Sequence, residues 1–204
     1  MTSDTIAGMA RWQPDARGRL EAAALELFRE RGFEHTTVTD IATRAGLDKR
    51  TFYRLFGDKR EALFSGGKRL EEVLVKAVAE ADAAPFETVV AAFRRVADEI
   101  FADRLDLVRV RQSIIEGSPE LQERELRKMG SLAAAVAAAL RAKGVGETTA
   151  ILATESGVTV FRVAFARWVA PDCDASLTDL ITEVVAELRA VTSAPGLHPE
   201  LGHR

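Results

Sequence analysis

Three basic side chains lie close together in the sequence, and their spacing places them on one side of a short helix. Lys49, Arg50 and Arg54 point away from Phe52 and Phe56, which are four residues apart and therefore share the opposite face. The aromatic face would pack into a core and leave the basic face free. Ammonium and guanidinium groups on such a face bind phosphate oxygens and the edges of guanine bases. The chemistry that these residues predict is recognition of a polyanion.

The positive charge is local. The stretch from Arg44 to Arg60 contains six basic and two acidic residues, a net charge of +4, whereas the whole chain of 204 residues carries −3. Attraction to phosphate decays over a Debye length of roughly 8 Å at physiological salt. A local basic patch can therefore bind a nucleic acid even on an acidic protein.

Capping residues predict the two helices that would position this patch. Thr37 and Asp40 have the spacing of a capping box, and a helix beginning there should end at Gly46, because glycine readily adopts the left-handed conformation of a turn. Asp48 then offers a second N-cap immediately before the basic residues. Two short helices joined by a glycine-containing turn are typical of a helix-turn-helix that reads a DNA major groove.

Further helices are expected on both sides of this motif. Apolar residues recur at helical spacing between residues 14 and 31, which predicts a preceding helix that completes a three-helix domain. Asp58 and Glu61 repeat the capping-box spacing and should start a helix that runs towards residue 83. Gly66 and Gly67 interrupt it, and they indicate either a hinge or a site of close packing.

The stretch LELFRERGFEHTTVTDIATRAGLDKRTFYRLFGDKREALF resembles the N-terminal DNA-binding region of the TetR family of transcriptional regulators. The resemblance covers roughly residues 20–63, with Asp48 where Ser is common and Leu47 in place of the usual Val. It implies that Lys49 and Arg50 read bases, while Tyr53 and Lys59 position the duplex. The complete set of DNA-binding residues that it implies is Thr37, Thr39, Lys49, Arg50, Thr51, Tyr53, Arg54 and Lys59.

The remainder of the chain also has helical periodicity, and no segment alternates with period two, so the predicted fold class is all-α. Helices are expected at residues 86–102, 105–115, 119–143, 147–169 and 177–191. The predicted organisation is a flexible tail (1–13), a helix-turn-helix domain (14–64), a helical effector-binding and dimerisation domain (65–192) and a second tail (193–204).

The family resemblance implies a homodimer that binds a small-molecule effector in the C-terminal domain. The ligand-binding candidates are Phe93, Arg109, Met129, Phe161 and Phe165. The dimer-interface candidates are Phe161, Trp168, Leu177, Ile181, Val184 and Leu188. An apolar stripe of this kind can equally form the core within one chain. The run RQSIIEGSPELQERELRKM, with FARWV later, resembles the C-terminal domain of mycofactocin-system regulators, which implies an apolar or acyl-CoA-like effector.

Several functions are not supported by the sequence. Cys173 is the only cysteine, and His35, His198 and His203 have no partner at metal-site or catalytic-triad spacing, so we expect no enzyme activity, metal or cofactor. No uninterrupted apolar run approaches the length of a membrane span, and a cytoplasmic location is expected. The sequence predicts a homodimeric repressor that binds a palindromic operator and is released by an effector. The alternatives are an activator, or a helical protein-interaction module without sequence-specific DNA binding.

Overall fold

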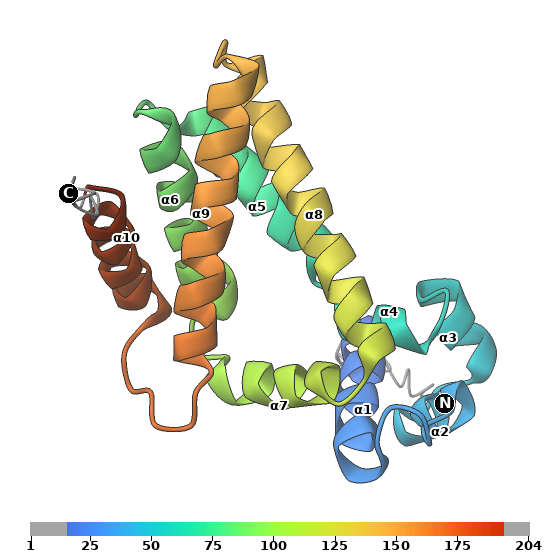
Figure 1. Cartoon of the computed structure of the whole chain (residues 1–204). Coiled ribbons are helices and arrows are strands. Elements are labelled where there is room, and N and C mark those ends of the chain that lie inside the picture. Colours follow the sequence, from blue (N-terminus) through green and yellow to red (C-terminus); the bar gives the residue numbers. More distant parts are fainter. Residues whose placement is uncertain (1–15, 194–204) are drawn as a thin grey trace, which may run out of the picture. The chain divides into compact units, whose positions relative to one another are not determined.

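The computed structural model describes residues 16–193, and over this range the chain forms helices and no strand (Figure 1). The all-α prediction is confirmed. Contacts within the chain divide it into two compact units, with the boundary between Ser65 and Gly66. The predicted tail at residues 1–13, most of the tail at 193–204, and His198 and His203 lie outside the described residues.

From residue 16 onward, the described part of the N-terminal unit contains four helices: α1 (Ala16–Arg31), α2 (Val38–Arg44), α3 (Lys49–Leu55) and α4 (Lys59–Phe64). Helix α1 packs against α2 and α4, and α2 packs against α3. Their apolar faces form a small core in which Leu20, Ile41 and Phe52 are each 0 % exposed. Burial of these side chains stabilises helices that are too short to be stable alone.

The two N-caps that precede α2 and α3 form as the sequence predicts. The Thr37 hydroxyl accepts the Asp40 amide at 3.1 Å, and the Asp40 carboxylate accepts the Thr37 amide at 2.9 Å, which completes the capping box. The Asp48 carboxylate accepts the Thr51 amide at 2.6 Å. These bonds satisfy amides that a helix start would otherwise leave unpaired. They fix where α2 and α3 begin.

The third predicted cap differs in one bond. Asp58 accepts the Glu61 amide at 3.0 Å, but the Glu61 carboxylate accepts the amide of Gly57, at 2.6 Å, and not that of Asp58. The helix that begins here is also shorter than predicted, because α4 ends at Phe64 and α5 begins at Gly67. The predicted interruption at Gly66 and Gly67 is therefore confirmed, and it divides the predicted helix into α4 and α5, which ends at Glu80.

The two glycines at this break have different surroundings. Gly66 has an ordinary right-handed conformation (φ −69°, ψ −7°), and a Cβ atom placed on it would meet nothing within 4 Å. A Cβ atom on Gly67 would lie 3.3 Å from Cε of Lys128. Close packing therefore explains glycine at position 67, and no packing contact explains it at position 66.

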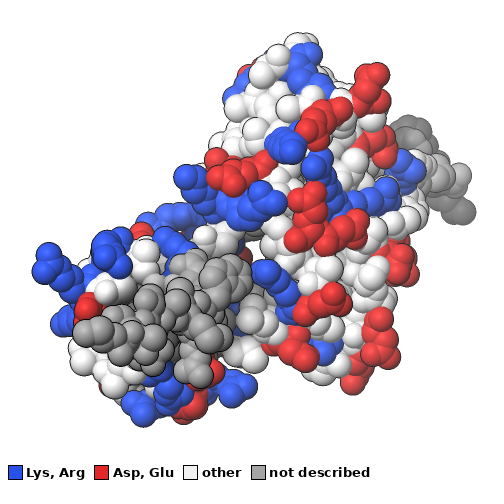
Figure 2. Space-filling view, turned by 180° about the vertical axis from the view of Figure 1, so that it is seen from behind, with Lys and Arg blue, Asp and Glu red and all other residues white. Residues whose placement is uncertain are grey.

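The C-terminal unit contains α5 (Gly67–Glu80), α6 (Pro85–Val96), the π-helical segment η1 (Ala97–Phe101), α7 (Leu105–Glu116), α8 (Pro119–Ala142), α9 (Glu147–Trp168) and α10 (Leu177–Ser193). Helix α9 packs against α6, α8 and α10, and α7 crosses one end of this bundle (Figure 1). The single helix predicted at 86–102 thus ends in a π-helical turn. Figure 2 shows acidic and basic side chains intermingled on this unit, and Arg95 pairs with Glu80 at 2.7 Å and Glu99 at 2.6 Å.

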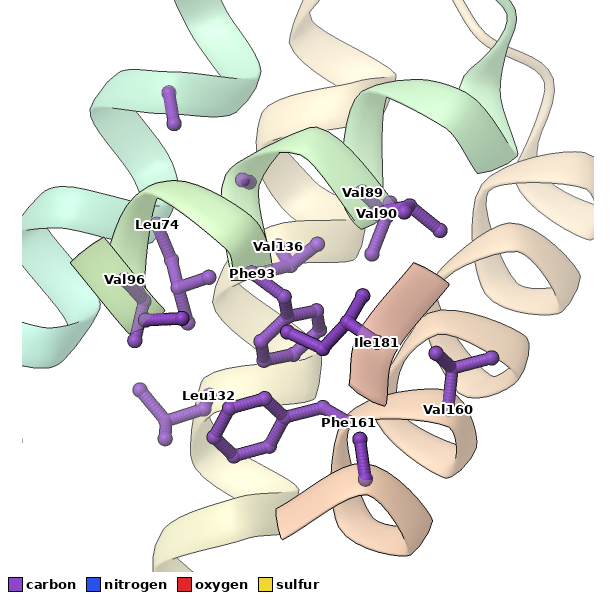
Figure 3. Close-up of a cluster of buried hydrophobic side chains, with 14 of the residues drawn as sticks. Leu74, Val89, Val90, Phe93, Val96, Leu132, Val136, Val160, Phe161 and Ile181 are labelled. Carbon is purple, nitrogen blue, oxygen red and sulfur yellow. The ribbon is translucent and has the colours of Figure 1, made fainter. Parts of the chain in front are cut away.

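The core of this unit is formed where α6 crosses α9. The rings of Phe93 and Phe161 stack with centroids 4.7 Å apart, and Ile181 of α10 lies beside them (Figure 3). Gly157 permits the close approach of the two helices, because a Cβ atom at this position would lie 2.4 Å from Cγ1 of Val89. Any larger residue at position 157 would push α6 away from α9.

Helix α9 is unusually apolar. Among the described residues it is the one helix long and apolar enough to cross a membrane, with a mean hydropathy of 1.2 over the relevant window. The sequence reasoning, which looked for an uninterrupted apolar run, did not identify it. Because α9 packs against three other helices of the bundle, its position in the core accounts for its apolar composition.

Candidate nucleic-acid interface and ligand site

Helix α3 separates its aromatic and basic side chains onto different faces. Phe52 is 0 % exposed and Phe56 is buried, whereas Lys49, Arg50 and Tyr53 are exposed. The Lys49 ammonium lies 5.8 Å from the centroid of the Tyr53 ring. Arg54, the third basic residue of this helix, is exposed as well. The helix therefore presents charged and aromatic groups that can contact a ligand.

Two arginines of α1 hold the ends of α2 and α3. Arg17 donates to the carbonyl of Leu55, the last residue of α3, at 2.9 Å. Arg19 donates to the carbonyls of Ala45 and Gly46 in the turn between the two helices. Cations stabilise the carbonyl end of a helix. The sequence analysis missed both residues, because no local pattern connects an arginine with a carbonyl 26 or 38 positions away.

Some of the basic residues counted in the sequence are already neutralised. Arg44 pairs with Glu26 at 3.2 Å and with Glu30 at 2.9 Å. The hydrogen bonds to these carboxylates raise the pKa of Arg44, and the bond from Arg44 lowers the pKa of Glu30. Arg60 pairs with Asp58. The positive field of the motif therefore comes mainly from the three basic residues of α3.

The side chain of Lys59 is bonded to groups within the protein. Its ammonium donates to the carbonyls of Phe33 at 2.7 Å and Thr36 at 3.2 Å, and it lies 4.2 Å from the centroid of the Phe33 ring. These groups belong to the connection between α1 and α2. The geometry argues against a primary role for Lys59 in binding phosphate and favours a role in holding this connection.

The three threonines predicted to contact DNA lie at helix starts. The Thr37 hydroxyl is committed to the capping box, since it also donates to the Asp40 carboxylate at 2.6 Å. Thr39 is exposed in the first turn of α2, and Thr51 is half-buried in the first turn of α3. The amides of Thr37 and Thr51 already donate to the carboxylates of Asp40 and Asp48. Of the three threonines, Thr39 is therefore the one whose amide, at the positive end of the α2 dipole, is placed to meet a phosphate group.

Comparison with known proteins identifies this motif. Residues 20–65 match the tetR family of bacterial regulatory proteins. Over 133 residues the chain is 32 % identical to the HTH-type transcriptional regulator TcmR of Streptomyces glaucescens, an alignment that covers 60 % of this chain. Residues 20–65 therefore form a DNA-binding region of the TetR type. The alignment spans 59 % of TcmR's length.

Solved structures of TetR-family proteins share the fold of the whole chain. The fatty acid degradation regulator FadR of Bacillus halodurans superposes with a TM-score of 0.60 at 19 % identity, covering 94 % of this chain and 99 % of that one. FadR of Thermus thermophilus, a TetR-family repressor solved in complex with lauroyl-CoA, has a TM-score of 0.53 at 24 % identity and covers 92 % and 100 % of the two chains. At these identities the likeness establishes a common fold. The named proteins that this chain resembles are regulators.

Arg109, the polar residue predicted to contact an effector, is used elsewhere. Its guanidinium donates to the carbonyl of Ala170 at 2.6 Å and to that of Val169 at 3.2 Å. These carbonyls lie at the end of α9. Arg109 therefore connects α7 to α9, and this role replaces the predicted ligand contact.

The aromatic ligand candidates belong to one cluster of rings. Phe161 lies between Phe93 and Phe165, at centroid distances of 4.7 Å and 5.6 Å. Phe101, which the sequence analysis did not select, lies 5.6 Å from Phe165 and 5.8 Å from Trp168. Phe93 and Phe161 are buried and fill the core, so the partly buried Phe101 and Phe165 are better placed to meet a ligand. The remaining candidate, Met129, is partly buried against the same core.

Most of the predicted interface residues are buried within a single chain. Ile181 is 0 % exposed, and four others are at most 5 % exposed: Phe161, Trp168, Leu177 and Val184. Leu188 is partly buried against the same core. The stripe on α10 is therefore core within the protomer. The large apolar side chains that α9 leaves in solvent are Ile151 and Leu152, which are 44 % and 63 % exposed.

A cavity of about 370 Å³ opens beside the π-helical segment, between η1, the start of α7, the end of α9 and the start of α10. Phe101, Trp168 and Leu177 contribute apolar walls, and Asp98 and Asp103 contribute carboxylates. The cavity has the size of a small-molecule site. Of the predicted ligand residues, none is among those that line it.

Proposed function

We propose that the chain is a homodimeric transcriptional repressor that binds operator DNA through α3 and leaves it when a small molecule occupies the C-terminal unit. The observation that carries the proposal is the exposed basic face of α3, on a helix whose two ends are fixed by the Asp48 cap and by Arg17. A helix fixed in this way can enter the major groove without further ordering. Its action on DNA implies a cytoplasmic location.

Within α3 we assign base reading to Lys49 and Arg50, in the first turn. N-terminal residues of a recognition helix contact base edges, and arginine or lysine binds O6 and N7 of guanine. Tyr53 and Arg54 lie one turn further on, where contact with the phosphate backbone is expected. Thr39 would support the backbone contacts through its amide at the start of α2, while the caps at Thr37 and Thr51 hold the helix starts in position.

The operator should be palindromic, because a two-fold dimer presents two copies of α3. The two half-sites must then lie about 34–36 Å apart along the DNA, or a multiple of that distance. Selection of bound duplexes from a random library, followed by sequencing, tests this expectation. Enrichment of an inverted repeat supports the proposal, and absence of any enriched sequence contradicts it.

The dimer interface should use the outward face of α9 and α10, since the inward stripe is occupied. Leu152 is the most exposed large apolar side chain of α9, at 63 %. Leu152→Glu should therefore dissociate the dimer and leave the protomer folded, whereas Ile181→Glu should unfold it by burying an unpaired carboxylate. Light scattering and circular dichroism separate the two outcomes. A Leu152→Glu protein that remains dimeric would contradict the assignment.

The effector would act on the C-terminal unit. The lauroyl-CoA bound by the Thermus thermophilus relative and the aromatic cluster beside the cavity both support an apolar ligand. An effector can release DNA simply by favouring a dimer whose recognition helices have a different spacing. The resemblance to mycofactocin-system regulators favours an acyl-CoA-like effector, whereas the lining of the cavity favours a different chemical class.

A further inference from the structure

We infer that the cavity beside η1 binds an organic cation with an apolar body, and that such a cation is the effector of this regulator. The second part rests on the proposed function, whereas the first part concerns the cavity alone.

The walls suit an apolar body. The partly buried ring of Phe101 lines the cavity, and Trp168, which is only 5 % exposed, packs against it with ring centroids 5.8 Å apart and an interplanar angle of 68°. Leu105 and Leu177 add aliphatic surface. The face of a phenylalanine ring also attracts cations. The same walls can therefore hold an apolar group and a positive charge.

The charged lining is acidic throughout. Asp98 and Asp103 contribute carboxylates, and within residues 16–193 no lysine or arginine lines the cavity. The Thr178 hydroxyl donates to Asp98 at 2.7 Å, which holds this carboxylate at the rim of the cavity. A fixed carboxylate beside aromatic rings attracts a cation and repels an anion. The phosphates of an acyl-CoA would be unfavourable here.

The cavity is connected to the core of the unit. Phe101 ends the π-helical segment and contacts both Phe161 and Phe165, at centroid distances of 6.1 Å and 5.6 Å. Phe161 in turn stacks on Phe93 of α6. A ligand that displaces Phe101 must therefore disturb the packing of α6 on α9. Single π-helical turns inside helices are rare and frequently lie at functional sites.

The test uses two ions of nearly the same shape and opposite charge, tetraphenylphosphonium and tetraphenylborate. The full-length Trp12→Phe protein is titrated with each ion, because Trp168 is then the only tryptophan and its fluorescence reports on the cavity. We expect saturable binding of the phosphonium, at least about tenfold tighter than that of the borate. Equal binding of the two ions, or preferential binding of the borate, would overturn the inference.

A matched pair of variants assigns the charge. Asp98→Asn removes the carboxylate charge and keeps an oxygen that can accept the Thr178 hydroxyl, whereas Asp82→Asn removes one negative charge from the exposed connection between α5 and α6. We expect Asp98→Asn to weaken phosphonium binding by about fivefold or more and Asp82→Asn to leave it unchanged. Equal effects of the two variants would show that only net charge matters and would refute the site.

Operator affinity measured with and without saturating phosphonium tests the regulatory part. We expect the cation to weaken operator binding, and the ratio of the two affinities to fall towards one in Asp98→Asn but not in Asp82→Asn. Saturable binding in the cavity with no change in operator affinity would overturn the effector assignment. A protein that binds no duplex even without the cation would instead contradict the proposed function, and the fluorescence titration would still decide the ligand site.

Discussion

Arg44 and Arg50 carry the same charge in the same helix-turn-helix, yet replacing each with glutamine should affect DNA binding very differently. Arg44 is paired with the carboxylates of Glu26 and Glu30, at 3.2 Å and 2.9 Å. The exposed side chain of Arg50 forms no hydrogen bond or ion pair with the described part of the chain. Counting charges would predict equal losses, whereas the structure predicts unequal ones.

The magnitudes follow from the role of each residue. A base contact by Arg50 contributes about 1–3 kcal/mol, so Arg50→Gln should weaken operator binding roughly 5- to 150-fold and relax the preference for one base. If its guanidinium also neutralises one phosphate, the slope of log affinity against log salt should decrease by about 0.9. Because Arg44 is already neutralised, Arg44→Gln should keep the wild-type slope and change affinity by no more than about twofold.

Fluorescence anisotropy with a labelled operator duplex, at several salt concentrations, measures both quantities. A duplex of scrambled sequence provides the non-specific reference, and circular dichroism verifies that both variants are folded. If Arg44→Gln reduced the slope as much as Arg50→Gln does, Glu26 and Glu30 would not neutralise Arg44 in solution. The assignment of the positive field to α3 would then be wrong.

Three further predictions concern stability. Lys59→Met should accelerate hydrogen exchange of the backbone amides at residues 33–37, because hydrogen bonds from a charged group to carbonyls contribute about 1.5–3 kcal/mol. If the exchange rates were unchanged and the salt dependence of DNA binding were reduced, Lys59 would instead be assigned to phosphate contact. Gly157→Ala should lower the free energy of unfolding of the C-terminal unit by about 1–3 kcal/mol, and adding Val89→Ala should restore part of this loss. Urea unfolding of the two single variants and the double variant measures this coupling, and purely additive effects would contradict the close contact. Burial lowers the pKa of Lys128 from 10.5 to about 8. Between pH 8 and pH 10.5 Lys128 is therefore protonated in the unfolded chain and largely deprotonated in the folded one. The wild-type free energy of unfolding should rise with pH over this range, and Lys128→Met should abolish that rise.

Local signals in the sequence were sufficient for the DNA-binding motif. The caps at Thr37 and Asp48 and the turn at Gly46 depend on residues within three or four positions of one another. Residues that are adjacent in the sequence are therefore sufficient to predict their geometry. The separation of Phe52 from the basic residues of α3 follows from helical periodicity, which is local in the same sense.

The periodicity of apolar residues does not predict which element packs against an apolar helix face. The stripe that contains Ile181 and Val184 was predicted to meet a second chain, but α6 and α9 of the same chain cover it. The pattern of apolar residues is identical in the two cases, because a core and an obligate interface bury the same kind of surface. Similarly, the sequence marked Arg109 as a polar residue on an apolar helix without revealing that carbonyls 60 residues away would bind it.

Long-range bonds to carbonyl groups explain where the free positive charge of the protein lies. Arg17, Arg19 and Lys59 donate to carbonyls at or beyond the ends of α3, α2 and α1, and Arg109 does the same at the end of α9. The helix dipole favours a cation at the carbonyl end of a helix, and the carbonyl groups partly neutralise its charge. Lys49 and Arg50 lie instead in the first turn of α3, at the amide end of the helix, and Arg54 is exposed in its last turn. A polyanion is therefore the partner that their charge is free to meet, even though the chain as a whole is acidic.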